Sequence, residues 1–316
     1  MATNKDTENN NPSAPTPADN DIAKLTEVTE QDLAEAIVDE YGAKYSKDGK
    51  RLLKGPRYAS LYNIKKGTEI IGNSAFLGCP RLTSITIPPS VTAIGDSALS
   101  HCESLTSITI PPSVHTMEGN PFKYWHGHIE IDSPYFKYED GALIDVEKGV
   151  LIAFRSIVNS YTIPSSVIAI GDSAFLGCPR LTSITIPLSV TAIGDAAFSY
   201  CSRLTSITIP PSVTTIGKEA FFSCKSLTSI TIPPSVTAIG DSAFSHCESL
   251  TSIAIPPSVT VIGEEAFYEC ESLTSINIPL SVDTIEDFAF FNCPNLDLTT
   301  KSEIRRRFGK RVFGLW

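Results

Sequence analysis

One 23-residue pattern recurs along this chain and constrains its fold more than any other feature. A clear copy is Leu227–Ser249, which reads LxxIxIPxSVxxIGxxAFxxCxx. A fixed period of this length predicts a solenoid in which each repeat forms one coil. One coil is too small to bury its own apolar side chains, so its stability must come from its neighbours. The same register begins again at Leu82, Leu105, Leu181, Leu204, Leu250 and Leu273.

The pattern also predicts the local structure of a coil. The segment LxxIxI alternates and is rich in β-branched residues, as expected of a short strand that pairs with the next coil. Pro233 has no N–H to donate and should end the strand. Gly240 permits a left-handed turn, and Asp241 is expected to cap one helical turn over Ser242–Cys247. The phenylalanines of one slot should stand in a row: Phe175, Phe198, Phe221 and Phe244.

The unit resembles the BspA-type leucine-rich repeat, a bacterial and protozoal subclass with the same period and the same IP, AF and C marks. The resemblance covers residues 45–298 approximately. It implies an α/β solenoid, namely a right-handed arc with a parallel concave β-sheet and short helical turns on the convex side. Known relatives are mostly surface-exposed proteins of host-associated microbes. The resemblance therefore also implies protein binding, cell adhesion and host interaction.

The two ends of the chain differ from the repeats. Residues 1–28 are rich in Asn, Pro, Asp and Thr and are expected to be disordered. Residues 29–43 predict a capping helix that begins with a capping-box-like pattern at Thr29. It would cover the first coil, or alternatively dock a partner. Residues 301–316 predict a basic C-terminal helix, capped by Ser302, that closes the core; binding of an anionic surface is the alternative.

The repeats occupy residues 44–300 and are interrupted at about 115–160. The cysteines of the first two coils are 23 residues apart, but Cys178 comes 76 residues after the second. The interruption predicts a degenerate coil, with Trp125 where a cysteine is due, and then a β-hairpin insertion. A related hairpin, around Asp48-Gly49, precedes the first coil. The sequence leaves open whether the inserted hairpin extends the sheet or projects from it.

The formal net charge of −10 is unevenly placed, with acidic residues concentrated in 1–45 and basic ones in 301–316. The repeats are left mildly acidic, which argues against nucleic acid as the main partner. The sequence shows no apolar leader and no run of apolar residues long enough to span a membrane. These features predict a cytoplasmic protein. A cell-surface or secreted protein whose leader has been removed is the alternative.

The eight cysteines and five histidines raise the question of disulfides or metal sites. Six cysteines share one slot of the repeat, so their side chains should point in parallel, and we predict buried free thiols. A zinc site needs converging ligands, which such a ladder does not provide. His126 and His128 are interpreted as a surface pair rather than a weak metal site. We find no phosphate-binding loop, nucleophile elbow or carboxylate pair, so no catalytic, cofactor or metal site is predicted.

The candidate binding surface flanks the cysteine slot. The outward residues of the strands are mostly Ser and Thr, which anchor protein partners poorly because hot spots favour Trp, Tyr and Arg. The positions beside each cysteine vary instead and carry aromatic and charged side chains. Neutral variation at exposed positions is the alternative explanation. The candidates are Leu77, Arg81, His101, Tyr200, Arg203, Phe222, Lys225, His246, Tyr268, Glu271 and Phe291.

Together these patterns predict a non-enzymatic, monomeric scaffold that recognises a protein partner through the solenoid surface and needs no cofactor. By its resemblance it would be adhesin-like. One alternative is a structural repeat spacer without a dedicated ligand. The other is binding of a regular surface, such as ice, by the Ser/Thr array.

Overall fold

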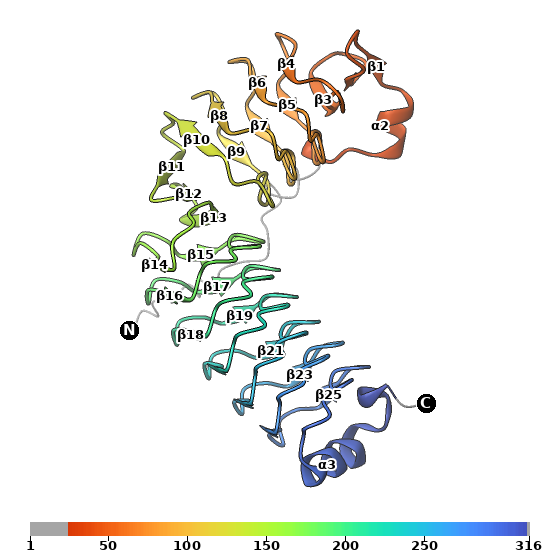
Figure 1. Ribbon diagram of the computed structural model, residues 1–316, viewed down its shortest axis with the longest axis vertical. Coiled ribbons are helices and arrows are strands. Elements are labelled where there is room, and N and C mark those ends of the chain that lie inside the picture. The colour runs from red at the N-terminus through yellow and green to blue at the C-terminus, as the bar shows by residue number, and fades with distance from the viewer. Residues whose placement is uncertain (1–24, 315–316) are drawn as a thin grey trace, which may run out of the picture.

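The computed structural model describes residues 25–314, which form a bent solenoid of stacked coils (Figure 1). Most of the tail expected to be disordered, residues 1–24, lies outside the described residues. Its last residues pack on the first coil: Thr26 is buried, and its carbonyl oxygen accepts the N–H of Asn73 at 2.7 Å. Among residues 25–314, no helix is both long and apolar enough to cross a membrane.

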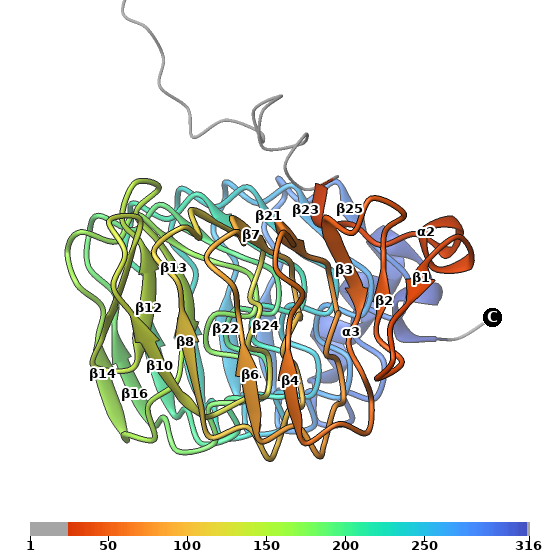
Figure 2. The ribbon, with the colours of Figure 1, turned by 90° about the horizontal axis from the view of Figure 1, so that it is seen from above.

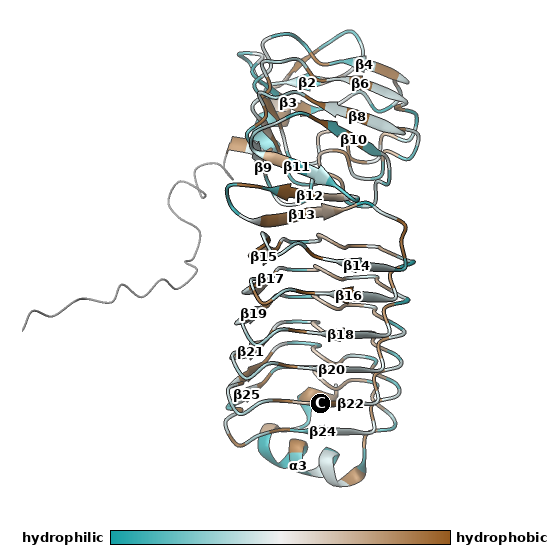
Figure 3. Ribbon diagram, turned by 90° about the vertical axis from the view of Figure 1, so that its left-hand side faces the viewer, coloured by the Kyte–Doolittle hydropathy of each residue, from teal (hydrophilic) through white to brown (hydrophobic). Residues whose placement is uncertain are grey.

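Each regular coil contributes two short strands, which build two rows (Figure 3). Neighbouring strands that pair across coils are parallel and place identical slots opposite each other, as Ile230 opposite Ile253. We call the first row the strand face. It comprises β4 (Leu61–Asn63), β6 (Ser84–Thr86), β8 (Ser107–Ile110), β10 (His128–Ile131), β14 (Ser160–Thr162), β16 (Ser183–Thr185), β18 (Ser206–Thr208), β20 (Ser229–Thr231), β22 (Ser252–Ala254) and β24 (Ser275–Asn277).

The second row consists of two-residue strands that follow the Ser-Val corner of each coil. It comprises β5 (Ile70–Ile71), β7 (Ala93–Ile94), β9 (Thr116–Met117), β15 (Ala169–Ile170), β17 (Ala192–Ile193), β19 (Thr215–Ile216), β21 (Ala238–Ile239), β23 (Val261–Ile262) and β25 (Thr284–Ile285). Between the rows lies the core, where the phenylalanines stack in one line as predicted. The rings of Phe198 and Phe221 are 5.4 Å apart and 5° from parallel.

The segment from the Asp slot to the cysteine, here named the cysteine turn, is not the helical turn that the sequence suggested. In Asp241–Cys247 the backbones of Ser242 (φ 52°) and His246 (φ 57°) are left-handed. The N–H of Phe244 donates to the carbonyl oxygen of Ala266 in the next coil at 2.8 Å. Such bonds between coils replace the bonds a helix would make within the segment. In Figure 1 these turns lie on the right-hand side, opposite the strand face.

Two residues predicted to shape this turn act on neighbouring coils instead. The Oδ1 atom of Asp241 accepts the N–H of Glu264, in the next coil, at 3.2 Å, so it does not cap its own turn. Gly240 does not have the positive φ that was expected. A Cβ atom at Gly240 would lie 3.0 Å from the backbone of Gly217, so the glycine is needed for close approach between coils.

An antiparallel three-stranded meander begins each half of the solenoid. The first is β1 (Ile37–Val38), β2 (Lys44–Tyr45) and β3 (Arg51–Lys54), and the second is β11 (Phe136–Glu139), β12 (Ala142–Asp145) and β13 (Val150–Phe154). Both are followed in their sheets by parallel strands of the second row. The insertion therefore extends the sheet, and it divides the core into two clusters of buried side chains.

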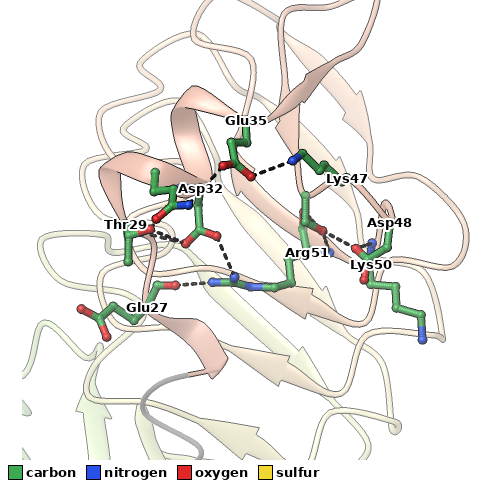
Figure 4. A network of polar contacts seen from close by, with 10 residues as sticks. Glu27, Thr29, Asp32, Glu35, Lys47, Asp48, Lys50 and Arg51 are labelled. Atoms are coloured by element: carbon green, nitrogen blue, oxygen red, sulfur yellow. Dashed lines mark hydrogen bonds and ion pairs between the residues drawn. The ribbon is translucent and has the colours of Figure 1, made fainter.

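The N-terminal helix is shorter than the predicted range 29–43. Helix α2 spans Glu30–Ala34 and has the expected capping box, in which the N–H of Asp32 donates to Thr29 Oγ1 at 3.1 Å. Arg51 donates to Asp32 at 3.2 Å and also contacts the carbonyl oxygen of Glu27 (Figure 4). The chain then turns into strand β1, whose two residues are exposed, rather than covering the core as a helix.

The C-terminal helix is shorter than the predicted range 301–316 and begins earlier. Helix α3 spans Leu298–Phe308, and its N-cap is Asp297, whose carboxylate accepts the N–H of Thr300 at 2.9 Å. Ser302, the predicted cap, lies within the helix. A short 3₁₀ helix, η1 (Arg311–Phe313), follows it. Ile304 and Val312 are buried in the second core cluster, so this segment covers the last coil.

Candidate protein-binding surface

Five of the predicted binding residues come together as one line of aromatic rings along the cysteine turns of the second half. The ring centroids are 5.3 Å apart for Tyr200 and Phe222, 5.2 Å for Phe222 and His246, 5.5 Å for His246 and Tyr268, and 5.0 Å for Tyr268 and Phe291. We call these five residues the aromatic column. The contacts join five consecutive coils, so the column is a continuous feature of the surface.

The cysteine turn explains why rings from two different slots meet. Tyr200 and His246 immediately precede their cysteines and have the left-handed backbone of that position. Phe222, Tyr268 and Phe291 come one residue earlier in their coils. Rings from the two positions nevertheless touch, with planes at 63° for Tyr200 and Phe222 and 15° for Tyr268 and Phe291. Tyr200 remains 46% exposed, and the other four side chains are half-buried.

Two glutamates pair with neighbouring side chains along the aromatic column. His246 Nδ1 lies 3.0 Å from Glu269 Oε2, and Lys225 Nζ lies 2.8 Å from Glu248 Oε1. The hydrogen bond from Lys225 to Glu248, with the attraction between their charges, raises the pKa of the ammonium group. Partial burial and then the negative charge of Glu269 raise the pKa of the Tyr268 phenol. Arg203 and Glu271, the remaining candidates of this half, are exposed.

In the first half, the predicted residues do not form a comparable line. Leu77 is 52% exposed and Arg81 is exposed, but neither makes a recorded ring contact with the aromatic column within residues 25–314. His101 stacks on Tyr124, with ring centroids 4.6 Å apart and planes 21° from parallel. The three candidates of this half therefore remain predictions.

Tyr124 is a surface aromatic that the sequence reasoning missed. Its ring lies over Gly177, the first residue before a cysteine in the second half, at 3.3 Å from the position of an added Cβ. Burial raises the pKa of its phenol, and the nearby Tyr200 and Glu219 add to this effect. Tyr124 thus stacks on His101 of the first half and lies beside Gly177 of the second. The signal was present, because Tyr124 precedes Trp125, which occupies a cysteine slot.

The cysteines beneath the column are structural. All eight are free and buried. The thiol of Cys224 donates to the carbonyl oxygen of Phe198 at 3.2 Å, and that of Cys247 to Phe221 at the same distance. Burial raises the pKa of Cys247 to about 12. Within residues 25–314, no group of three or more His, Cys, Asp or Glu side chains could hold a metal ion.

Some hydroxyl groups of the Ser/Thr array make hydrogen bonds within the protein. The Thr228 hydroxyl donates to the carbonyl oxygen of Thr205 at 3.2 Å, and that of Thr251 to Thr228 at 3.3 Å. At the corner, Ser235 donates to the carbonyl oxygen of Val213 at 2.5 Å. These repeated hydroxyls satisfy backbone groups between coils. The Ser and Thr of each strand itself, such as Ser229 and Thr231, face solvent.

The repeats match the family described as BspA type leucine rich repeat region, in six copies over residues 58–138, 153–267 and 237–314. The chain belongs to this family. Its members are non-enzymatic repeat scaffolds of the kind found in surface and protein-interaction proteins. No curated protein matches this chain.

Several solved structures are similar to this BspA-type chain. A leucine-rich cell surface protein from Faecalibacterium prausnitzii is 30% identical, with a TM-score of 0.58, covering 79% of this chain and 62% of its own. The pneumococcal vaccine antigen PcpA is 21% identical, with a TM-score of 0.66 and coverages of 79% and 65%. A leucine-rich repeat protein from Eubacterium ventriosum is 23% identical, with a TM-score of 0.56 and coverages of 79% and 92%. The alignments span less than two thirds of the Faecalibacterium prausnitzii protein and of PcpA. At 21% and 23% identity, PcpA and the Eubacterium ventriosum protein show the fold alone.

Proposed function

We propose that this BspA-type chain is a scaffold that binds a protein partner through the aromatic column. The observation that carries the proposal is the continuity of the five rings across five coils. Aromatic side chains dominate binding hot spots because they bury a large area at a small cost in conformational entropy. The stacked coils beneath hold the rings in place before a partner arrives, which reduces the ordering cost of binding.

The chemistry beside the column favours a partner that carries basic residues. Glu248 and Glu269 already pair with Lys225 and His246, while Glu264 and Glu271 nearby are exposed. Acidic groups around aromatic rings attract Lys and Arg, both through charge and through contact with ring faces. An adhesin role at a cell surface is part of this proposal. It is supported by the surface location stated for the similar Faecalibacterium prausnitzii protein. A cytoplasmic location stays the alternative prediction.

A capture experiment with matched variants tests the proposed surface. Immobilised chain is exposed first to host extracellular proteins and then to cell lysate, and retained proteins are identified by mass spectrometry. The test variant is Tyr200→Ala with Tyr268→Ala. The control is Leu188→Ala, which removes a 73% exposed apolar side chain at a corner outside the column. We expect a specific partner to be lost from the test variant and kept by the control. No partner, or equal retention by the test variant, contradicts the proposal.

A further inference from the structure

The two ends of the strand face differ in what covers their outer edges. At the C-terminal end, α3 lies over β24, and the Arg307 guanidinium donates to the carbonyl oxygens of Ile278, Pro279 and Val282 at 3.0, 2.9 and 3.1 Å. At the N-terminal end, β4 pairs with β6 and with no other strand of residues 25–314. An open strand edge is a template for another chain, and proteins usually cover such edges. Within residues 25–314, the outer edge of β4 therefore has no strand partner.

The hydrogen-bonding groups at this edge can be assigned from the ladder. The carbonyl oxygen of Ser60 accepts the N–H of Ser84 at 3.2 Å, and the N–H of Ile64 donates to Thr86 at 3.1 Å. In a parallel ladder, alternate residues bond to opposite sides. The N–H and C=O groups of Leu61 and Asn63 therefore point to the open edge, and no hydrogen bond to them from residues 25–314 is recorded. The edge offers two donors and two acceptors.

A groove of about 660 Å³ lies against these groups. Its lining comes from β4 on one side and from the loop of the first meander that includes Glu40 and Tyr41 on the other. The meander stands beside β4 (Figure 2). Tyr62 forms part of the lining, and its hydroxyl donates to Asp39 at 2.7 Å. Tyr41 (62% exposed) and Leu61 (65% exposed) leave apolar surface in the groove.

We propose that this groove binds an extended segment of a partner protein, which adds one strand to the sheet along β4. Backbone groups of the segment would pair with Leu61 and Asn63, as in other cases of strand addition. The chain's own N-terminal segment is poorly suited, because Pro12, Pro15 and Pro17 remove backbone donors. A second copy is also poorly suited, because its own meander projects beside the same edge.

The charged groups of the groove indicate which side chains the bound segment should carry. The Asp39 carboxylate is already used, since it accepts the N–H groups of Tyr41 and Ala43 at 3.0 and 2.8 Å in addition to the Tyr62 hydroxyl. The Lys65 ammonium lies 4.6 Å over the centre of the Tyr45 ring. Glu40 is exposed, and no ion pair to it is recorded within residues 25–314. We therefore expect a segment with an apolar side chain between Tyr41 and Leu61 and a Lys or Arg beside Glu40.

Selection from a phage-displayed library of linear peptides tests this site. Peptides of about eight residues are selected on the full chain, because an added strand needs only a short extended segment. We expect enriched peptides to combine apolar residues with Lys or Arg. A bound peptide should slow hydrogen exchange at the Leu61 and Asn63 amides by about tenfold or more, because both become hydrogen-bonded.

Two variants and one control decide the outcome. Glu40→Lys reverses the free charge without touching the core and should weaken peptide binding by about tenfold. Asn63→Pro removes an outward N–H and should abolish binding, with circular dichroism used to verify the fold. Tyr200→Ala, in the aromatic column, should bind the peptides normally, so failure here is distinguishable from failure of the proposed function. No enrichment, or peptides that bind Glu40→Lys and folded Asn63→Pro as tightly as the original chain, would overturn the proposal.

Discussion

The two halves of the solenoid begin with the same module and place it in different surroundings. Each meander is antiparallel and leads into parallel strands of the second row. Each also has a register shift at the corresponding place, between Lys44 and Tyr45 in the first and between Leu143 and Ile144 in the second. Lys44 and Leu143 are therefore equivalent positions. Lys44 is charged and half-buried, whereas Leu143 is apolar and fully buried.

The difference follows from what packs on each meander. The first has coils on one side only, so the Lys44 ammonium can reach outward and donate to the Leu33 carbonyl oxygen at 3.3 Å. The second lies between two cores, and β12 is buried at all four of its positions. Leu143 packs in the first core cluster and Ile144 in the second. Figure 3 shows β12 and β13 as hydrophobic. The same local structure thus serves as an end cap where coils pack on one of its faces, and as an internal divider where coils pack on both.

Substituting each of the two equivalent residues by the type found at the other position tests this comparison most strongly. Leu143→Lys buries an ammonium group without a partner between two cores, and we expect it to lower the free energy of unfolding by about 3–5 kcal/mol. Lys44→Leu loses a long hydrogen bond at an end and should change it by less than about 1 kcal/mol. Urea unfolding followed by circular dichroism measures both. Equal costs would contradict the assignment of the second meander as an internal divider.

The junction between the halves depends on Asn120, which is fully buried. Its amide donates to the carbonyl oxygen of Ser173 at 2.7 Å and accepts from the guanidinium of Arg155 at 2.9 Å. Asn120→Ala should lower the free energy of unfolding by about 3 kcal/mol, because it leaves buried polar groups unpaired.

Arg155→Met is the matched control for this junction. Two of the Arg155 nitrogens have no hydrogen-bond partner among the described residues 25–314. Replacing this buried cation by an apolar side chain of similar length should therefore cost about 1 kcal/mol or less. Chemical denaturation of both variants and of the double variant provides the comparison. A larger loss from Arg155→Met than from Asn120→Ala would show that the guanidinium, rather than the amide, holds the junction.

Alkaline pH should affect the second half more than the first, because burial raises the thiol pKa of five cysteines in the second half and of two in the first. Burial raises the pKa of Cys247 and Cys293 to about 12, from an ordinary value of 9.0. Between these values the unfolded chain loses thiol protons that the folded chain keeps, so stability is complete below pH 9.0 and falls as the pH rises towards 12. Unfolding measured between pH 8 and 11 should show this fall. Cys247→Ala should make it shallower, and an unchanged slope would argue against the buried thiols as its cause.

A smaller effect is expected at the Asp slot of the cysteine turn. In the first half, Asn73 Oδ1 accepts the N–H of Asp96 at 3.0 Å. Lys218 occupies this slot in the second half and cannot accept a bond from the N–H of Asp241. Lys218→Asn should therefore raise the free energy of unfolding by about 0.5–1 kcal/mol, even though it removes a surface ion pair. Thermal unfolding of both variants measures this effect, and Lys218→Ala should show no such gain in the free energy of unfolding.

Part of the candidate site could be predicted from the sequence and part could not. The variable positions beside the cysteines predicted Tyr200, Phe222 and Tyr268 as surface aromatics. Their contact depends on a left-handed backbone at the residue before cysteine, which the motif does not reveal. Tyr124 was missed because its coil departs from the pattern. The groove at β4 was missed for a different reason: it requires a meander and a strand edge to lie side by side.

The sequence by itself determined the solenoid, the stack of phenylalanines and the buried thiols. Identical slots that recur every 23 residues must lie beside one another in a stack. Only the tertiary structure decided the form of the cysteine turn, the role of Gly240 and the lengths of the end helices. In each case bonds or close contacts between coils, or at the ends of the stack, outweigh local preference. A glycine that a motif marks as a turn can therefore serve instead as the place where two backbones touch.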